Sequence, residues 1–500
     1  MLLNGRSLEV AEILLQKKNE VYNVVKAEQH VHRELSEYFT FEVPEAKFMP
    51  LYRNKVWDGK IRLYSPGNGE IYGGLTEHIQ QWCATMNYTL RYQDNEHFGL
   101  PYEVNPISQV AVRMFMKNIL KNSRFEKIEP RPYQIEGVTL ALRHNRKLLL
   151  SPTGSGKSLM VYAITRFHVA QRRKVLLVVP TTSLVEQMYN DFIEYGWDVR
   201  KHCHKIYAGA EKYKKSNVTI TTWQSIYKEP RKFFEKFDVV LGDEAHLFKS
   251  KSLTKIMTKL HSCKYRIGFT GTLDGTLTHK WILEGLFGPC EQLIKTKELM
   301  DKGHLTPLKV KCLVLKHEWG TFDSYQDEID YLIEHPKRNN LIKNLCLDLR
   351  GNTLVLFNYV ERHGEPLYNL INTSTESRKV FFVHGGVDTE DREEVRKITE
   401  LENDAIIVAS YGTFSTGINI KRLHNIVFAS PSKSRIRNLQ SIGRVLRRGK
   451  GKTVATLYDI SDNISRGEWK NFTFKHFEER LKIYQQEKFD YEIIKVQTKF

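Results

Sequence analysis

Short apolar runs alternate with helical patterns over most of the chain. Between about residues 125 and 300 the runs are rich in β-branched residues: KLLLS, KVLLVVP, VTITTW, DVVLGDE and RIGFTGT. The same pattern returns further along as TLVLFNY, KVFFVHG, AIIVASY, NIVFAS and TVATLYD. Such alternation is typical of parallel sheets covered by helices. We therefore predict an α/β protein with two tandem parallel-sheet domains, at residues 125–300 and 301–500, and a charged linker near residues 295–308.

The N-terminal region has a different pattern. GKIRLY alternates polar and apolar positions as a half-exposed strand does, and LTEHIQQWC places its apolar residues on one helical face. Residues 1–105 are predicted to form a small α/β module, and residues 106–124 a connecting helix that contains VAVRMFMKNIL. At the other end, Phe477, Leu481 and Tyr484 recur at helical spacing. We expect this C-terminal helix to pack onto the second sheet domain, the alternative being a partner-binding face.

Composition adds a preference for polyanions. The 500 residues include 76 Lys and Arg against 58 Asp and Glu, a formal net charge of +18. Such an excess favours a phosphate-rich partner. No apolar run approaches the ~20 residues that span a bilayer, so we expect no membrane association. The cysteines are scattered without a CxxC pair, which favours a reducing cytoplasm.

The segment LLLSPTGSGKSLM carries the first candidate chemistry. It follows a predicted strand and opens a helix, as a phosphate-binding P-loop does. Its glycines allow backbone N–H groups to surround phosphate oxygens, the lysine reaches the β- and γ-phosphates, and the final hydroxyl is a ligand for Mg²⁺. The strict pattern has glycine where this chain has Ser151. The candidate nucleotide-binding residues are Pro152, Thr153, Gly154, Ser155, Gly156, Lys157 and Ser158.

The stretch FDVVLGDEAHLF places Asp243 and Glu244 at the end of a strand in the same domain. Adjacent carboxylates repel each other unless a cation lies between them. We predict that Asp243 and Ser158 hold Mg²⁺ and that Glu244 orients or deprotonates the attacking water. The site is predicted to hydrolyse a nucleotide.

The segment QSIGRVLRRGK sets Arg444 and Arg447 three residues apart, on one helical face. If that face meets the P-loop, both arginines stabilise charge on the γ-phosphoryl group during its transfer. The alternative is a basic surface helix.

These motifs occur in the order and spacing of superfamily 2 helicases, which the chain from Arg131 onward resembles. In chain order they are RPYQIEG, SPTGSGKS, VVPTTSLVEQ, TTWQSI, DEAH, FTGT, VLFNYVERHG, ASYGTFSTGINI and QSIGRVLR. With its small N-terminal module and RNKVWDGKIRLY, the chain is similar to the UvsW-type DEAH-box helicases of T-even and related phages, which act on branched DNA. The resemblance implies two RecA-like domains, ATP as the substrate and Mg²⁺ as its cofactor.

The resemblance also implies roles for single residues. Gln134 should read the adenine edge beside Arg131, and Gly417, Gln440, Arg444 and Arg447 should close the site from the second domain. His246, Thr270 and Thr272 should link nucleotide and nucleic acid. The expected backbone contacts are Pro180, Thr181, Thr222, Gln224, Asn358, Tyr359, Ser410 and Thr416. Short hydroxyl and amide groups bind phosphates without reading a base, which suits movement along any sequence.

Two motifs depart from the family pattern. The usual Ser-Ala-Thr of the third motif is Thr270-Gly271-Thr272, which keeps both hydroxyls. Asn419 stands where an acid is common, which puts a ribose contact in doubt.

Basic residues surround the tryptophan in RNKVWDGKIR, and Trp57, Lys60 and Arg62 are candidate DNA contacts. The alternative is a tryptophan that anchors the core of the module, with solvated charges around it.

Together these observations predict a monomeric, ATP-dependent DNA helicase or translocase that remodels forks, displacement loops and four-way junctions. One alternative is an RNA helicase, since the DEAH letters occur in both classes. A second is a basic annealing protein for which ATP is only a conformational ligand. A third, the motor of a restriction system, predicts nuclease or specificity domains for which this sequence has no room.

Overall fold

The computed structural model describes residues 12–44, 46–93, 106–124, 128–207, 209–318, 320, 322–417, 420, 422–430, 432–449 and 451–496. The predicted boundaries at residues 105 and 125 lie outside these ranges. The chain forms two compact units. One contains the residues up to Leu150 and Gly156–Leu293, and the other contains Ser151–Ser155 and the chain from Ile294 onward.

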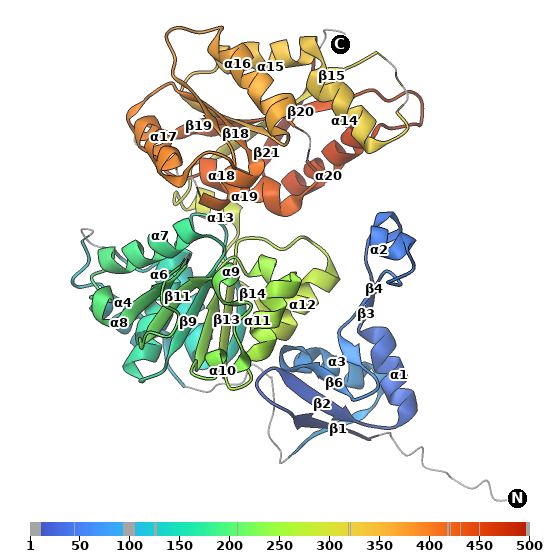
Figure 1. The fold of residues 1–500 in the computed structure, drawn as a ribbon, viewed down its shortest axis with the longest axis vertical. Coiled ribbons are helices and arrows are strands. Elements are labelled where there is room, and N and C mark those ends of the chain that lie inside the picture. The colour runs from blue at the N-terminus through green and yellow to red at the C-terminus, as the bar shows by residue number, and fades with distance from the viewer. Residues whose placement is uncertain are drawn as a thin grey trace, which may run out of the picture. The chain divides into compact units, whose positions relative to one another are not determined.

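The first unit begins with a small module around a mixed sheet of order β5-β6-β2-β1-β7 (Figure 1). Its strands are β1 (Glu12–Lys17), β2 (Tyr22–Lys26), β5 (Tyr64–Ser65), β6 (Glu70–Tyr72) and β7 (Thr89–Tyr92). Its helices are α1 (Gln29–Tyr38), the 3₁₀ turn η2 (Gly73–Leu75) and α3 (Thr76–Met86). The apolar face predicted for LTEHIQQWC is confirmed, because Leu75, Ile79 and Trp82 are buried in the module's core.

A two-stranded ribbon, β3 (Thr40–Glu42) and β4 (Lys60–Arg62), extends from this module (Figure 1). Between its strands lie η1 (Ala46–Phe48) and α2 (Pro50–Arg53). We call residues 46–58 the module tip. Gly59, at the base of the tip, has φ of 78°, and a Cβ there would lie 3.0 Å from Ala46 and from the Tyr52 ring. Only glycine allows this close approach.

The rest of the first unit is a parallel sheet of order β10-β11-β9-β12-β13-β8-β14, which we call lobe 1. Its strands are β8 (Arg146–Leu150), β9 (Val175–Val179), β10 (Cys203–Ile206), β11 (Val218–Thr222), β12 (Val239–Gly242), β13 (Tyr265–Thr270) and β14 (Cys290–Gln292). Its helices are α4 (Gln109–Ile119), α5 (Pro132–Arg143), α6 (Lys157–Ala170), α7 (Thr182–Glu194), α8 (Val199–His202), α9 (Trp223–Ile226), α10 (Arg231–Phe234), η4 (Ala245–Lys249), α11 (Lys251–Lys259) and α12 (Leu277–Phe287).

Successive strand residues of lobe 1 point to opposite faces of the sheet. Leu149 and Leu177 pack under α4–α7, whereas Leu148 and Leu176 pack under α9–α12. Both faces are therefore covered, which explains the continuous apolar runs in the sequence.

The second unit contains a parallel sheet of order β17-β18-β16-β19-β20-β15-β21, which we call lobe 2. Its strands are β15 (Leu308–Lys316), β16 (Asn352–Phe357), β17 (Val380–Val383), β18 (Ile406–Ser410), β19 (Leu423–Phe428), β20 (Ala455–Asn463) and β21 (Asp490–Val496). Its helices are α13 (Thr296–Asp301), α14 (Tyr325–Glu334), α15 (Pro336–Asp348), the π-turn η5 (Val360–Gly364), α16 (Glu365–Asn372), α17 (Thr389–Leu401), α18 (Tyr411–Gly417), α19 (Arg435–Val445) and α20 (Phe472–Gln486). The prediction of two tandem parallel-sheet domains is confirmed.

The segment predicted as a charged linker connects β14, a strand of lobe 1, to β15, the first strand of lobe 2, and it contains the helix α13 at Thr296–Asp301. The side chain of Glu298 accepts from the backbone N–H of Lys295 at 3.3 Å and caps α13, and Leu299 and Met300 are buried. The cap and the two buried side chains stabilise this short helix. Its many charged residues are the reason why the sequence pattern did not indicate it.

The C-terminal helix packs onto lobe 2 as predicted. Phe477 and Tyr484 of α20 are buried, while Leu481 is only half-buried. Glu328 of α14 accepts from the backbone N–H of Thr473 at 2.7 Å, so a carboxylate from another helix caps the start of α20.

Candidate active site

The predicted P-loop lies between the end of β8 and the start of α6. Gly154 and Gly156 have φ of 83° and 81°, a region that favours glycine. Within the loop, the Ser155 hydroxyl donates to the carbonyl oxygen of Pro152 at 2.7 Å, and the Ser151 hydroxyl donates to Ser155 at 2.6 Å. Ser151 thus holds the loop through its hydroxyl at the position where the strict pattern has glycine. Thr153 lies between Pro152 and Gly154 in this loop.

Gln134 of α5 lies directly against the loop. Its side-chain oxygen accepts from the backbone N–H of Arg131 at 2.9 Å, and its amide nitrogen would lie 2.4 Å from a Cβ added to Gly156. Arg131 donates to the hydroxyl of Tyr133 at 3.0 Å. The structure therefore brings Gln134 to the P-loop, while its contact with adenine stays a prediction.

Ser158, in the first turn of α6, has a partner that the sequence did not indicate. Its hydroxyl lies 2.9 Å from the phenol oxygen of Tyr195, which follows α7. Burial is the main cause of a raised pKa at Tyr195, so this phenol stays protonated near neutral pH. Tyr195 fixes the orientation of the Ser158 hydroxyl, but no short motif contains it.

Asp243 follows the buried strand β12, which lies between β9 and β13 in the sheet. Its backbone N–H donates to the carbonyl oxygen of Val178 at 3.0 Å. Burial first, and then the charge of Glu244, raise the pKa of Asp243 above its ordinary value, whereas the positive charge of Lys157 opposes the shift. As the sequence predicted, the neighbouring charge of Glu244 makes the ionised form of Asp243 less favourable.

The donor set near Asp243 fits Mg²⁺. Within the described part of the chain, Oδ1 of Asp243 is buried and has no hydrogen-bond partner. A buried carboxylate oxygen without a hydrogen-bond donor is stabilised by a bound cation. Mg²⁺ prefers oxygen ligands such as carboxylate and hydroxyl groups. Asp243 and Ser158 would hold the ion, which would neutralise charge on the β- and γ-phosphates.

Glu244 has φ of 48°, so its backbone turns sharply at the end of the strand. The turn starts η4 and brings His246 back toward the sheet, where its Nδ1 lies 3.0 Å from Oγ1 of Thr270 and 3.4 Å from Glu244. The Thr270 hydroxyl donates its proton to the carbonyl oxygen of Thr272 at 3.1 Å. Nδ1 of His246 therefore donates to Thr270. Thus Glu244, His246, Thr270 and Thr272 form one connected group.

His279 of α12 extends this group and was missed in the sequence. Its Nε2 donates to the carbonyl oxygen of His246 at 2.9 Å, because a carbonyl oxygen can only accept, and its Nδ1 lies 3.0 Å from Oδ1 and 3.1 Å from the backbone N of Asp274. His279 is fully buried. A lone histidine in an apolar helix gives no pattern that would reveal this contact.

The predicted nucleic-acid contacts of lobe 1 come together at the carboxyl ends of two adjacent strands. Thr181 lies after β9 and its side chain caps α7, whereas Thr222 ends β11 and directly precedes α9. The Gln224 side chain donates to the carbonyl oxygen of Pro180 at 3.5 Å, which joins the two loops.

The predicted contacts of lobe 2 lie at or after the carboxyl ends of β16 and β18, which are also adjacent. Asn358 accepts a hydrogen bond at 3.1 Å from Arg437, an exposed residue of α19 that the sequence analysis did not single out. Tyr359 lies 3.5 Å from Gln326, and the buried Ser410 donates to Thr413 at 2.8 Å. Thr416 and Gly417 end α18, and their contacts are outside the described parts of the structure.

The predicted phosphate-stabilising residues lie on or just after α19. Gln440 and Arg444 belong to the helix, and Arg444 lies 5.8 Å from the centre of the Phe414 ring. Arg447 follows the helix, and its carbonyl oxygen accepts from Lys452 at 3.0 Å and from Thr306 at 3.3 Å. Their contact with a nucleotide stays a prediction.

The three N-terminal candidates lie at the module tip and on β4. Nε1 of the half-buried Trp57 donates to the carbonyl oxygen of Lys60 at 2.8 Å. Arg62 pairs with Asp58 at 2.5 Å, and Lys60 lies 3.9 Å from Glu42. Trp82, not Trp57, belongs to the core of the module, so the alternative in which Trp57 anchors that core is wrong.

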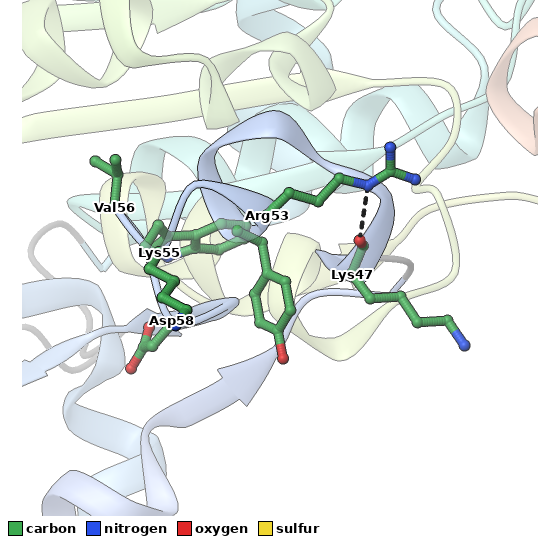
Figure 2. A pocket seen from close by; sticks show the side chains of 7 residues that line it. Lys47, Arg53, Lys55, Val56 and Asp58 are labelled. Carbon is green, nitrogen blue, oxygen red and sulfur yellow. Dashed lines mark hydrogen bonds between the residues drawn. The ribbon is translucent and has the colours of Figure 1, made fainter.

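Figure 2 shows the side chains around a hollow at the tip. It is lined by Lys47, Tyr52, Arg53, Lys55, Val56, Trp57 and Asp58. Arg53 donates through Nε to the backbone of Lys47 at 3.4 Å, and its guanidinium end extends away from the hollow (Figure 2). Basic and apolar groups thus share one exposed surface.

Comparison with known proteins relates this geometry to a family. Residues 12–93 match the family described as DNA helicase UvsW, N-terminal, residues 127–275 match the type III restriction enzyme res subunit, and residues 336–449 match the helicase conserved C-terminal domain. The ATP-dependent DNA helicase UvsW of Enterobacteria phage T4 is 34% identical over 493 residues, which cover 93% of this chain and 96% of that protein. The chain belongs to the UvsW family of ATP-dependent DNA helicases.

A solved structure of this family matches almost the whole chain. The crystal structure of T4 UvsW matches with a TM-score of 0.51 and 30% identity, covering 97% of this chain and 99% of that one. A more distant relative, the DNA 3′-5′ translocase XPB2 of Sulfurisphaera tokodaii, is 29% identical over 191 residues, which cover 38% of this chain and 40% of that protein. The UvsW-family likeness therefore includes the N-terminal module as well as both lobes.

In the part of the chain that the structure describes, no helix has the length and apolar character needed to cross a membrane.

Proposed function

We propose that this UvsW-family helicase is a monomeric, Mg²⁺-dependent motor that uses ATP to remodel branched DNA in the cytoplasm of the host cell. The observation that carries the DNA assignment is the N-terminal module, residues 12–93, because it matches a module of DNA helicases. The lobes alone do not distinguish DNA from RNA motors.

The chemistry follows from the residues of lobe 1. Lys157 binds the β- and γ-phosphates, and Ser158 and Asp243 hold the cation that neutralises their charge. Glu244 orients the attacking water and accepts its proton. Arg444 and Arg447 of lobe 2 stabilise the negative charge that develops on the γ-phosphoryl group, with Gln440 beside them. Arg131, Gln134 and Gly417 complete the nucleotide contacts.

Both lobes contact the sugar-phosphate backbone of a DNA strand. Pro180, Thr181, Thr222 and Gln224 line the joined loops of lobe 1, and Asn358, Tyr359, Ser410 and Thr416 follow strands of lobe 2. These side chains and backbone groups bind phosphate oxygens without reading bases. Arg437 adds a charge beside Asn358, which supports a phosphate contact at that point.

The module tip binds a duplex arm beside the branch point. Lys47, Arg53 and Lys55 are exposed there, together with the apolar side chains of Phe48, Leu51 and Val56. Cationic groups contact phosphates, and exposed apolar and aromatic groups pack against bases where a duplex opens. This combination of groups favours binding to a DNA junction over binding to a continuous duplex, because a continuous duplex exposes the faces of its end base pairs only.

The tip makes a measurable contribution to DNA affinity. We expect the double variant Arg53→Ala/Lys55→Ala to bind forked DNA about tenfold more weakly at 100 mM salt. The plot of log K against log salt should also lose about 1.8 of its slope, since each phosphate contact contributes about 0.9. Fluorescence anisotropy over a salt series measures both quantities. The matched control Lys26→Ala/Arg33→Ala removes the same charge from exposed positions of the same module; equal losses in the two variants would show a general charge effect and no tip site.

Motor activity and substrate class are tested together. ATPase rates with linear, forked and four-way DNA and with RNA should be highest with branched DNA. Lys157→Ala should abolish both ATP hydrolysis and strand separation. Strongest stimulation by RNA would indicate an RNA helicase. If pairing of complementary strands is the main activity and Lys157→Ala keeps it in full, the chain would be an annealing protein.

A further inference from the structure

The helix α12 has two faces that contact different partners. His279, Leu283 and Leu286 lie at spacings of four and three, and all three are buried on the side of lobe 1. Trp281, Glu284 and Gly285 also lie at spacings of three and four, but on the opposite side of the helix. A helix with apolar residues on both sides is buried on both sides.

The first face reaches the nucleotide site. His279 donates to the carbonyl oxygen of His246, whose ring bonds to Thr270 and lies beside Glu244. A shift of Glu244 or His246 during hydrolysis therefore acts directly on α12.

The second face is docked against the N-terminal module. Glu284 lies 2.9 Å from Nε2 of His78, and the His78 ring packs on Trp281 with centroids 4.2 Å apart. A Cβ added to Gly74 would lie 2.0 Å from the carbonyl oxygen of Glu284. The two backbones thus approach as closely as glycine allows, and the contact leaves little freedom for sliding.

Trp281 also contacts the root of the ribbon that carries the module tip. Its ring centroid lies 5.4 Å from that of Phe39, directly before β3, and 5.1 Å from that of Phe41, within β3. β3 leads to the tip within the same ribbon. Contacts on the two faces of α12 therefore connect Glu244 to the root of the ribbon that carries the module tip.

We propose that α12 couples the nucleotide site to the DNA-binding tip, with His279 and Trp281 as its positioning residues. This inference rests on the proposed function. Close-packed contacts at both faces transmit small displacements, and coupling between two sites is reciprocal. DNA bound at the tip thus changes nucleotide affinity through α12, and nucleotide changes DNA affinity by the same factor.

A thermodynamic cycle tests the coupling. The dissociation constant of a non-hydrolysable ATP analogue is measured with and without saturating forked DNA, in the wild type and in Trp281→Ala. In the wild type, saturating DNA should change the dissociation constant of the analogue by a factor of about five or more. In Trp281→Ala this factor should fall below about two. Its nucleotide affinity without DNA should be unchanged, because Trp281 lies on the face away from His246. Leu277→Ala, at an exposed position of the same helix, is the matched control and should keep the full factor.

Two further measurements separate the possible failures. If Trp281→Ala lowers thermal stability, Phe41→Ala serves as a milder variant, because it removes only one contact with the Trp281 ring. It should also reduce the effect of DNA on nucleotide affinity. Trp281→Phe, which keeps an aromatic ring, should retain part of that effect. A wild type whose ATPase does not respond to DNA would contradict the proposed function. A wild type with full coupling that persists in both Trp281→Ala and Phe41→Ala would overturn the role of α12.

Discussion

Glu244→Gln should lower the DNA-stimulated kcat for ATP hydrolysis by a factor on the order of 10² to 10⁴, the range of a lost general base. The amide keeps the size of the side chain and cannot accept the proton of the attacking water. Steady-state ATPase rates at saturating forked DNA and ATP measure the effect.

Nucleotide binding should survive this substitution. The charge of Glu244 is one cause of the raised pKa of Asp243, so removing it favours the ionised form of Asp243, which would hold the proposed cation. The affinity for Mg²⁺·ATP should therefore stay equal or increase. The control Glu235→Gln changes an exposed carboxylate of the same lobe and should leave kcat unchanged. A Glu244→Gln enzyme with nearly full kcat would show that another group activates the water.

Arg480→Ala should destabilise lobe 2 by about 3–5 kcal/mol, the usual cost of leaving one partner of a buried ion pair alone. Arg480 donates to both oxygens of Asp459 at 2.8 Å, to Ser461 at 3.0 Å and to the carbonyl oxygen of Ser432 at 3.1 Å. Tyr484 donates to the same carboxylate at 2.8 Å. Without the guanidinium, Asp459 would be a buried charge with only neutral donors.

Calorimetry, or urea unfolding followed by a probe in lobe 2, measures this loss. The control Lys482→Ala breaks an exposed pair with Glu479 on the same helix and should change stability by less than about 0.5 kcal/mol. In a double-mutant cycle with Asp459→Asn, the second substitution should cost much less once Arg480 is gone. Additive losses would show that the two side chains stabilise lobe 2 independently.

The family matches support much of what the local patterns predicted. The P-loop and the strand that ends in Asp243 were recognisable because each needs a fixed spacing of residue types within one short segment. Parallel strands were recognisable for a similar reason, since burial on both faces leaves continuous apolar runs. Family resemblance predicted that His246 and Thr270 link the nucleotide site to the nucleic acid. The structure places their side chains 3.0 Å apart, while the link to the nucleic acid stays a prediction.

Other residues had no local signature. Tyr195 and His279 act on Ser158 and His246 from segments distant in sequence, so spacing could not reveal them. The two tryptophans of the N-terminal module show the same limit: Trp57 and Trp82 both resemble core residues in sequence, but packing buries Trp82 and leaves Trp57 at the tip.

By itself, the sequence determined that the chain has two parallel-sheet lobes, a phosphate loop and an acidic strand end, because backbone periodicity and phosphate chemistry depend on near neighbours. Only the tertiary structure decided that α12 lies between the N-terminal module and the strand ends of lobe 1, and that Asp459 is neutralised by Arg480. Gly74 and Glu284 are far apart in the sequence. Their backbones meet because the surface of the N-terminal module fits the surface of lobe 1 at α12. That fit depends on the shapes of whole elements, which no short stretch of sequence contains.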